Sequence, residues 1–180
     1  MSKKLNCESG LTLVEMLCAV VILILLGLLL NTGLQMAARS YWDLTAHSEA
    51  QLLLSTAVDA LADELRCARR VTEDGTGGFT YASDCFGENT GLAVNSDGQI
   101  VARNGSTEKR LLSTGAYGSG GAYVVSEMKI TPSIPADPDR EITFTVELTV
   151  QTADGRLRSE TPGGGVTVRC LNPKTDASGG

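Results

Sequence analysis

The sequence predicts an α+β protein in which a long N-terminal α-helix packs on a small antiparallel β-sheet. Residues 11–30 hold 17 apolar side chains. Residues 31–70 contain no proline and remain compatible with a helix. All five prolines and 17 of the 20 glycines follow Arg70, where short runs of alternating polarity are separated by turn residues. A helix followed by a sheet is the arrangement that this division favours.

The first thirty residues have the polarity of a membrane-inserted segment. Residues 1–10 form a predicted leader peptide that carries Lys3 and Lys4, and positive charge holds the preceding end of a span in the cytoplasm. Residues 11–30 are long enough to cross the hydrocarbon core, since twenty helical residues rise about 30 Å. We therefore expect a single-pass cell-membrane protein with a cytoplasmic N-terminus and an exported C-terminal part.

One carboxylate, that of Glu15, interrupts this apolar stretch. An acidic residue at the centre of a span costs about 2.5–3.5 kcal/mol on insertion scales, and is by default a functional hypothesis. Glu15 lies close to the Gly10–Leu11 junction, near the end of the span. The segment Ser9–Glu15 (SGLTLVE), with the basic leader before it and the apolar run after it, resembles the cleavage and methylation motif of type IV prepilins and type II secretion pseudopilins. Leu11 departs from the phenylalanine that usually opens the mature chain in that family.

The resemblance implies a maturation step and an assembly step. A membrane-embedded prepilin peptidase would cut after Gly10 and methylate the new amino group of Leu11. A membrane platform and its assembly ATPase would then polymerise the product into an extracytoplasmic filament at the cell surface. Glu15 would pair with the amino terminus of a neighbouring subunit, because mispaired registers leave two charges uncompensated.

The resemblance also implies the fold and the partners. The fold would be type IV pilin-like, with an apolar transmembrane or filament-core helix over residues 11–30. The partners would be other pilins or pseudopilins, contacted through that helix, and the lipid bilayer before assembly.

Residues 31–70 are predicted to continue the helix in amphipathic form. One set of apolar side chains recurs at helical spacing and forms a stripe that we expect to pack on the sheet: Leu54, Val58, Leu61 and Leu65. The charged side chains nearby lie off this stripe and are expected to face water: Asp59, Asp63 and Glu64.

Residues 71–171 are predicted to form a β-rich globular head, and residues 172–180 a flexible tail. Residues 95–98 (NSDG) are typical of a hairpin turn. From Ile142 to Val150, apolar and polar residues alternate, as in a strand with one buried and one solvent-exposed face. We expect one sheet of four or five strands, with Val71–Asp84 as a loop. The candidate segments for these four or five strands are Gly91–Val94, Gln99–Arg103, Ala122–Thr131, Arg140–Thr152, Gly155–Glu160 and Val166–Leu171.

The cysteines allow one intramolecular disulfide at most in the exported part. Cys7 leaves with the leader, and Cys18 lies in the apolar span, where it is a small apolar residue. The remaining three are Cys67, Cys85 and Cys170. Both Cys67–Cys85 and Cys85–Cys170 are open as pairings, because spacing does not determine connectivity.

Neither a metal site nor an enzymatic site is predicted, and no cofactor is expected. The single histidine, His47, is interpreted as a solvated helix residue. Asp137, Asp139 and Glu141 lie close together, as in an oxygen-ligand calcium loop, but the three prolines of residues 132–141 favour a rigid turn. The chain shows no nucleophile–base set and no Gly-x-Ser-x-Gly elbow.

Net charge argues against direct nucleic-acid binding. The whole chain carries −6, and loss of Lys3, Lys4 and Glu8 with the leader makes the net charge −7. The sequence therefore favours a non-enzymatic minor pilin or pseudopilin of a type IV filament system. Two alternatives stay open: a competence or type II secretion pseudopilin of a short fibre, and a membrane-tethered or secreted binding domain with an ordinary signal sequence.

Overall fold

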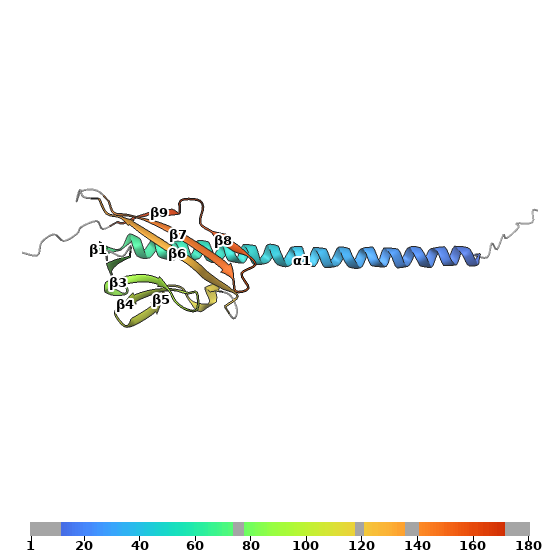
Figure 1. Ribbon diagram of the computed structural model, residues 1–180, viewed down its shortest axis with the longest axis horizontal. Coiled ribbons are helices and arrows are strands. Elements are labelled where there is room, and N and C mark those ends of the chain that lie inside the picture. Colours follow the sequence, from blue (N-terminus) through green and yellow to red (C-terminus); the bar gives the residue numbers. More distant parts are fainter. Residues whose placement is uncertain (1–11, 74–77, 118–120, 136–140, 172–180) are drawn as a thin grey trace, which may run out of the picture. The chain divides into compact units, whose positions relative to one another are not determined.

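The computed structural model describes residues 12–73, 78–117, 121–135 and 141–171 (Figure 1). Contacts divide the chain into two units, Met1–Leu44 and Thr45–Gly180. Helix α1, Leu13–Arg66, is continuous and supplies residues to both units. In the second unit the end of this helix is followed by antiparallel strands, so the predicted α+β class with a long N-terminal helix packed on antiparallel β-structure is confirmed.

The first sheet is a meander of five antiparallel strands in chain order. The predicted hairpin around residues 95–98 is confirmed, since Val94 pairs with Ile100. Its turn is held by the Asn95 side chain, which accepts hydrogen bonds from the N–H groups of Asp97 and Gln99. The strands are β1 (Arg69–Glu73), β2 (Phe79–Ser83), β3 (Gly87–Val94), β4 (Ile100–Asn104) and β5 (Thr107–Arg110).

The prediction of a loop over Val71–Asp84 is wrong, because β1 and β2 pair as antiparallel strands there. Val71 and Tyr81 are buried, and Phe79 packs against the core. Strand β5 also lies outside the prediction. All four of its residues are polar and exposed, so it carries no alternating pattern; it is held by its ladder with β4 and by the Arg103–Glu108 ion pair at 3.0 Å.

The second sheet has β7 at its centre. Strand β6 pairs along one side of β7, and β8 and β9 pair with opposite ends of its other side. The head therefore contains two sheets where one was expected. The strands are β6 (Tyr123–Ser133), β7 (Thr143–Thr152), β8 (Arg158–Glu160) and β9 (Val166–Arg169), and a short 3₁₀-helix, η1 (Thr114–Tyr117), precedes them.

The turn between β3 and β4 connects the two sheets. The carbonyl of Gly98 accepts a hydrogen bond from the N–H of Val125 in β6 at 2.8 Å. Gly98 has a φ of +68°, and a β-carbon there would lie 2.5 Å from the Cβ of Val124. Glycine is thus required for the two sheets to approach at this turn.

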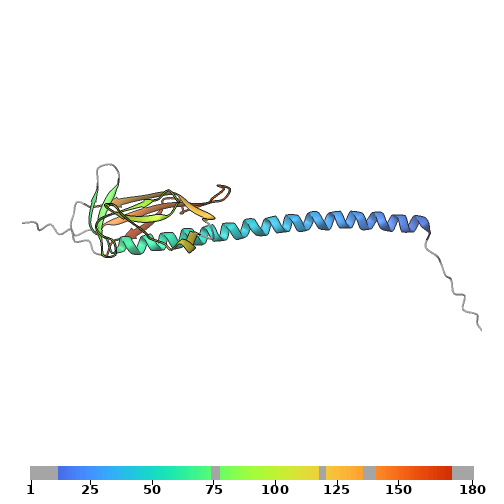
Figure 2. The ribbon, with the colours of Figure 1, turned by 90° about the horizontal axis from the view of Figure 1, so that it is seen from below.

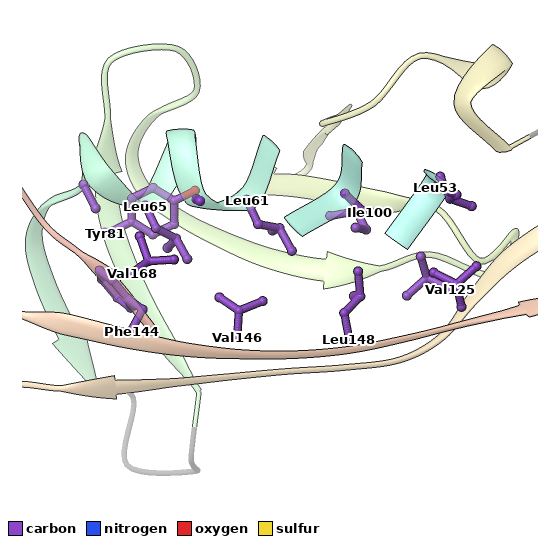
Figure 3. Packing of buried hydrophobic residues seen from close by; sticks show 14 of the residues in the cluster. Leu53, Leu61, Leu65, Tyr81, Ile100, Val125, Phe144, Val146, Leu148 and Val168 are labelled. Carbon is purple, nitrogen blue, oxygen red and sulfur yellow. The ribbon is translucent and has the colours of Figure 1, made fainter. Parts of the chain in front are cut away.

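The core of the head lies between the end of α1 and the strands. Figure 2 shows the Thr45–Arg66 part of α1 running along one side of the sheets. In Figure 3, Phe144 and Val146 point from β7 toward Leu65 and Leu61 of the helix, and Leu148 lies on the same side of β7. These five side chains are at most 1% exposed. The predicted alternation in β7 holds apart from Thr149, which is buried at 6% exposure.

The predicted helix stripe is displaced by part of a turn. Leu61 and Leu65 are buried as expected, but Leu54 and Val58 lie at the flank of the core and are only partly buried. The buried line of α1 is instead formed by Ala50, Leu53, Ala57, Leu61, Ala62 and Leu65. The small alanines allow close approach of the helix to the strands, so a count of large apolar residues alone misplaces the contact face.

Candidate functional site

Helix α1 begins with reciprocal hydrogen bonds between Thr12 and Glu15. The Glu15 carboxylate accepts from the backbone N–H of Thr12 at 2.9 Å and from its hydroxyl at 3.0 Å. The Thr12 hydroxyl in turn accepts from the backbone N–H of Glu15 at 3.3 Å. This pattern is a capping box, in which two backbone donors at a helix start are satisfied by side chains. A negative charge there is also favoured by the helix dipole.

The capping box gives Glu15 a role that the sequence interpretation missed. The signal was present, because Thr12-Leu13-Val14-Glu15 has the Thr-x-x-Glu spacing of this motif. The predicted cleavage residues Gly10 and Leu11 lie outside the described residues. Thr12 directly follows Leu11, the predicted new amino terminus. The Glu15 carboxylate therefore accepts a hydrogen bond from the backbone N–H of the second residue of the predicted mature chain.

The side chains that follow the capping box form a continuous apolar surface. Each residue from Leu13 to Leu30 is exposed, and the most apolar 18-residue stretch of α1 has a mean hydropathy of 3.0 with none of it buried. A soluble helix of this length shows an apolar face and a polar face, but this segment is apolar all round. By length and composition, α1 can span a membrane.

Two tyrosines attach the strands to the second part of α1. The Tyr123 hydroxyl, at the start of β6, donates to the Glu49 carboxylate at 2.7 Å, and the Tyr81 hydroxyl of β2 donates to Glu64 at 3.2 Å. The expectation that Glu64 faces water is wrong, because this residue is half-buried and accepts the hydrogen bond from Tyr81. Burial, and then the bond to Glu49, raises the pKa of Tyr123 to about 12. Burial and the neighbouring Glu64 carboxylate also raise the pKa of Tyr81 well above its usual range.

A third tyrosine completes this set. The Tyr117 hydroxyl of η1 accepts a hydrogen bond from the N–H of Ile100 at 2.8 Å, and the residue is 2% exposed. Burial raises the pKa of Tyr117 above its usual value, although the bond from Ile100 acts in the opposite direction. The head thus uses buried tyrosines, each with a hydrogen-bond partner for its hydroxyl, to link its layers.

The three cysteines of the second unit differ in exposure. Cys67 follows the end of α1 and Cys85 follows β2, and both are exposed free thiols. Cys170 is buried, and its thiol donates to the carbonyl of Ala68 at 3.0 Å. The backbone of the next residue, Leu171, donates to the carbonyl of Arg66. A disulfide among these residues remains a prediction, with both pairings open.

The three acidic residues that resemble a calcium loop are only partly described. Asp137 and Asp139 lie outside the described residues, and Glu141 pairs with Arg169 at 3.7 Å. His47 is exposed, and its ring lies 3.3 Å from the Gln51 side chain. Within the described part of the chain, no group of three His, Cys, Asp or Glu side chains is placed to hold a metal ion.

Arginines on the surface of the head are engaged by carboxylates. Arg158 of β8 lies 3.5 Å from Glu127 of β6 and 3.7 Å from Glu160. Further pairs of this kind among the described residues are Arg69–Asp84, Arg70–Glu88, Arg103–Glu108, Arg156–Asp154 and Arg169–Glu141. Exposed pairs of this sort contribute at most about 1 kcal/mol each to stability. Their effect here is to neutralise the positive groups locally on a chain of net negative charge.

Comparisons with known protein families, with curated proteins and with solved structures gave no match. The likeness to type IV prepilins therefore depends on the leader, on residues 9–15 and on the apolar run after them. Of these, Thr12–Glu15 and the apolar helix lie within the described residues.

Proposed function

We propose that this protein is a non-enzymatic structural subunit of a type IV filament system, a minor pilin or pseudopilin. In this proposal, a prepilin peptidase removes residues 1–10 and methylates Leu11, and the mature chain assembles through the first part of α1. The observation that carries the proposal is the junction of three features at one point of the chain. Gly10, the Thr12–Glu15 capping box and the start of an apolar helix follow one another within six residues.

The capping box supports the role of Glu15 at the new amino terminus. Cleavage after Gly10 creates a positively charged amine on Leu11. The next backbone N–H, that of Thr12, already donates a hydrogen bond to Glu15. The carboxylate is thus oriented toward the helix start, and in this proposal the amine of a neighbouring subunit pairs with it there. In an apolar environment, an unpaired carboxylate and an unpaired ammonium group each carry a large desolvation penalty. Subunits that bring the two charges together are therefore favoured over misaligned ones.

The first part of α1, which is apolar on every side, suits two successive environments: a lipid bilayer and the core of a filament. A helix apolar on every side needs either lipid or other apolar helices around it. Before assembly, the bilayer supplies that environment, with the N-terminus on the cytoplasmic side. After assembly, copies of the same helix supply it in the core of the filament, outside the cytoplasm. The platform and ATPase of such a system move the subunit between these environments.

The head is suited to contact with protein and not with nucleic acid. The chain is acidic, and several arginines of the head pair with carboxylates, such as Arg158 with Glu127. Release of counterions from phosphates needs unpaired positive charge. We therefore place any nucleic-acid contact of the filament on other subunits.

Mass spectrometry of the mature N-terminus tests the proposal. The full chain is expressed with a prepilin peptidase, and the intact mass is measured. We expect a chain that has lost residues 1–10 and gained one methyl group on Leu11. A chain that begins near Ala38 indicates an ordinary signal peptide, and one that retains Met1 indicates a simple membrane tether; either result overturns the proposal.

A pair of glycine variants makes the cleavage test specific. Gly10→Leu is expected to abolish cleavage and leave the precursor in the membrane. Gly27→Ala is the matched control, because a β-carbon at Gly27 meets nothing within 4 Å. We expect Gly27→Ala to be cut as efficiently as the natural chain. Equal cleavage of both variants would contradict the assignment of Gly10.

A further inference from the structure

Beyond Leu30, the first unit of the chain contains residues that are typical of a membrane–water interface. No charged side chain occurs between Glu15 and Arg39, and Arg39 is closely followed by Tyr41 and Trp42. Both rings are exposed, Tyr41 at 66% and Trp42 at 70%. They meet edge to face, with centroids 6.1 Å apart and an interplanar angle of 75°. Trp42 is the single tryptophan of the chain.

The distance along α1 matches the thickness of a bilayer. The 24 residue steps from Glu15 to Arg39 rise about 36 Å, slightly more than the 30 Å or so of a hydrocarbon core. From Leu13 to Trp42 the rise is about 43 Å, which equals the thickness of a bilayer with both headgroup layers. When Glu15 lies at the cytoplasmic interface, the Arg39–Trp42 segment reaches the opposite one.

The polar side chains between these charged ends have partners inside the helix. The Thr32 hydroxyl donates to the carbonyls of Leu29 at 2.9 Å and Leu28 at 3.1 Å. The Gln35 amide donates to the Asn31 side chain at 3.4 Å, one helical turn away. Polar groups at membrane depth must be satisfied within the protein, because lipid tails offer no partners. In the stretch after Leu30, Thr32 meets this requirement, and the Asn31 and Gln35 amides meet it in part through their mutual bond.

We propose that Arg39, Tyr41 and Trp42 anchor the precursor at the outer headgroup layer of a phospholipid bilayer, so that the membrane-embedded part of α1 extends well beyond Leu30. Tyrosine and tryptophan favour this layer, since the ring is apolar and its N–H or O–H reaches water. The guanidinium of Arg39 supplies a charge that suits lipid phosphates. Asp43, the next residue, begins the polar part of the helix.

This inference rests on the membrane-anchored stage of the proposed function. It commits to lipid as the occupant of the exposed rings, and not to a second copy of the chain. A contact with a second copy would depend on protein concentration in the membrane. A contact with headgroups does not.

Fluorescence of the single tryptophan tests the anchor. The full chain is reconstituted in vesicles of phosphatidylethanolamine and phosphatidylglycerol that contain lipids brominated at either the upper or the terminal part of the acyl chain. We expect Trp42 to be quenched more strongly by the upper bromines. Its emission and quenching are expected to remain unchanged when the protein-to-lipid ratio is lowered.

Two relocated tryptophans serve as references. In a Trp42→Phe background, Leu28→Trp reports the hydrocarbon core, and Thr107→Trp, on the exposed strand β5, reports water. We expect the emission of Trp42 to lie between those of the two references. Emission equal to that at position 107, strongest quenching by terminal bromines, or loss of quenching on dilution would overturn the inference.

The references also separate this inference from the proposed function. If Leu28→Trp is quenched and Trp42 is not, the span is embedded and only the anchor is wrong. If Leu28→Trp is not quenched either, the membrane stage itself fails. If Trp42 behaves as expected but residues 1–10 are not removed, the anchor stands and the filament proposal fails.

Discussion

The Tyr123 hydroxyl and the Glu49 carboxylate lie 2.7 Å apart, 74 positions from each other in the sequence. This bond joins the first residue of β6 to helix α1 at the edge of the core, where Tyr123 is 6% exposed. It thus links the second sheet directly to the helix that carries the proposed assembly segment.

Tyr123→Phe is expected to destabilise the head by about 1–2 kcal/mol. Hydrogen bonds to charged groups contribute about 1.5–3 kcal/mol, and this one contributes less because Glu49 is exposed and regains water. Denaturant unfolding of the full chain in detergent measures the change. Glu49→Gln is the matched control, since it keeps an acceptor at the same position and should lose less. A change within about 0.5 kcal/mol for Tyr123→Phe would contradict the role of the bond.

The buried tyrosines predict a loss of stability in alkali. Burial and the bond to Glu49 raise the pKa of Tyr123 to about 12, above the ordinary tyrosine value of about 10. The folded state therefore holds this proton more tightly than the unfolded state does. The resulting stabilisation is complete below about pH 10 and is lost as the pH rises through 12.

Denaturant unfolding at a series of alkaline pH values, together with phenolate absorbance, measures this dependence. The pKa values of Tyr81 and Tyr117 are raised as well, in each case chiefly by burial, so they act in the same direction. Tyr123→Phe should reduce the slope of stability against pH between about 10 and 12. An unchanged slope in that variant would show that Tyr123 ionises alike in both states.

Leu61→Ala is expected to cost about 2–5 kcal/mol, the usual range for a buried leucine. Leu61 is 0% exposed and packs in the same cluster as the inward side chains of β7. Leu52→Ala is the control on the same helix, because Leu52 is 68% exposed, and it should change stability by less than about 0.5 kcal/mol. Thermal unfolding of the two variants compares them directly. Equal losses would mean that the assigned contact face of α1 is wrong.

The parts of the fold that the sequence predicted well are those with a long regular pattern. The apolar run opening α1 and the alternation in β7 each extend over enough residues to specify one structure. The buried face of α1 was misplaced because Ala50 and Ala57 carry little apolar area, although they set how closely the helix approaches the strands. Strand β5 has no apolar residue, so only its backbone pairing with β4 reveals it.

At the candidate site, Glu15 fits two roles, and only one of them was predicted from the sequence. The prepilin-like pattern predicts that Glu15 pairs between subunits, and the structure gives the same carboxylate a local role as the partner of Thr12. Similarly, Val71–Asp84 was predicted to be a loop, although Phe79 and Tyr81 alternate with polar residues as in a strand. Local sequence admits both possibilities at such places, and tertiary contacts decide between them.

Gly165→Ala is expected to destabilise the head by about 2–4 kcal/mol, through a left-handed backbone and a steric clash. Gly165 has a φ of +74°, and a β-carbon there would lie 2.7 Å from the Val146 carbonyl oxygen in β7. Gly163→Ala is the matched control two residues away, where nothing lies within 4 Å and φ is not positive. Chemical denaturation should show a change within about 0.5 kcal/mol for the control. A similar small change at Gly165 would contradict the close crossing over β7.

A series of variants at Thr12 and Glu15 separates the capping role of the carboxylate from its proposed pairing role. Glu15→Gln keeps the capping-box pattern and removes the charge, whereas Thr12→Ala removes the cap and keeps the charge. Loss of one partner of a buried ion pair costs about 3–5 kcal/mol, a factor of roughly 10² or more in association, while a cap contributes about 1 kcal/mol.

We therefore expect Glu15→Gln to fail in assembly as severely as Glu15→Ala, and Thr12→Ala to assemble nearly as well as the natural chain. The measurement is the fraction of subunit in sheared filaments relative to the membrane fraction, and cleavage after Gly10 in each variant controls for insertion. Normal assembly of Glu15→Gln combined with failure of Thr12→Ala would assign the carboxylate to the helix cap alone. The charge would then have no part in the filament, because the neutral amide still provides an acceptor for the Thr12 N–H.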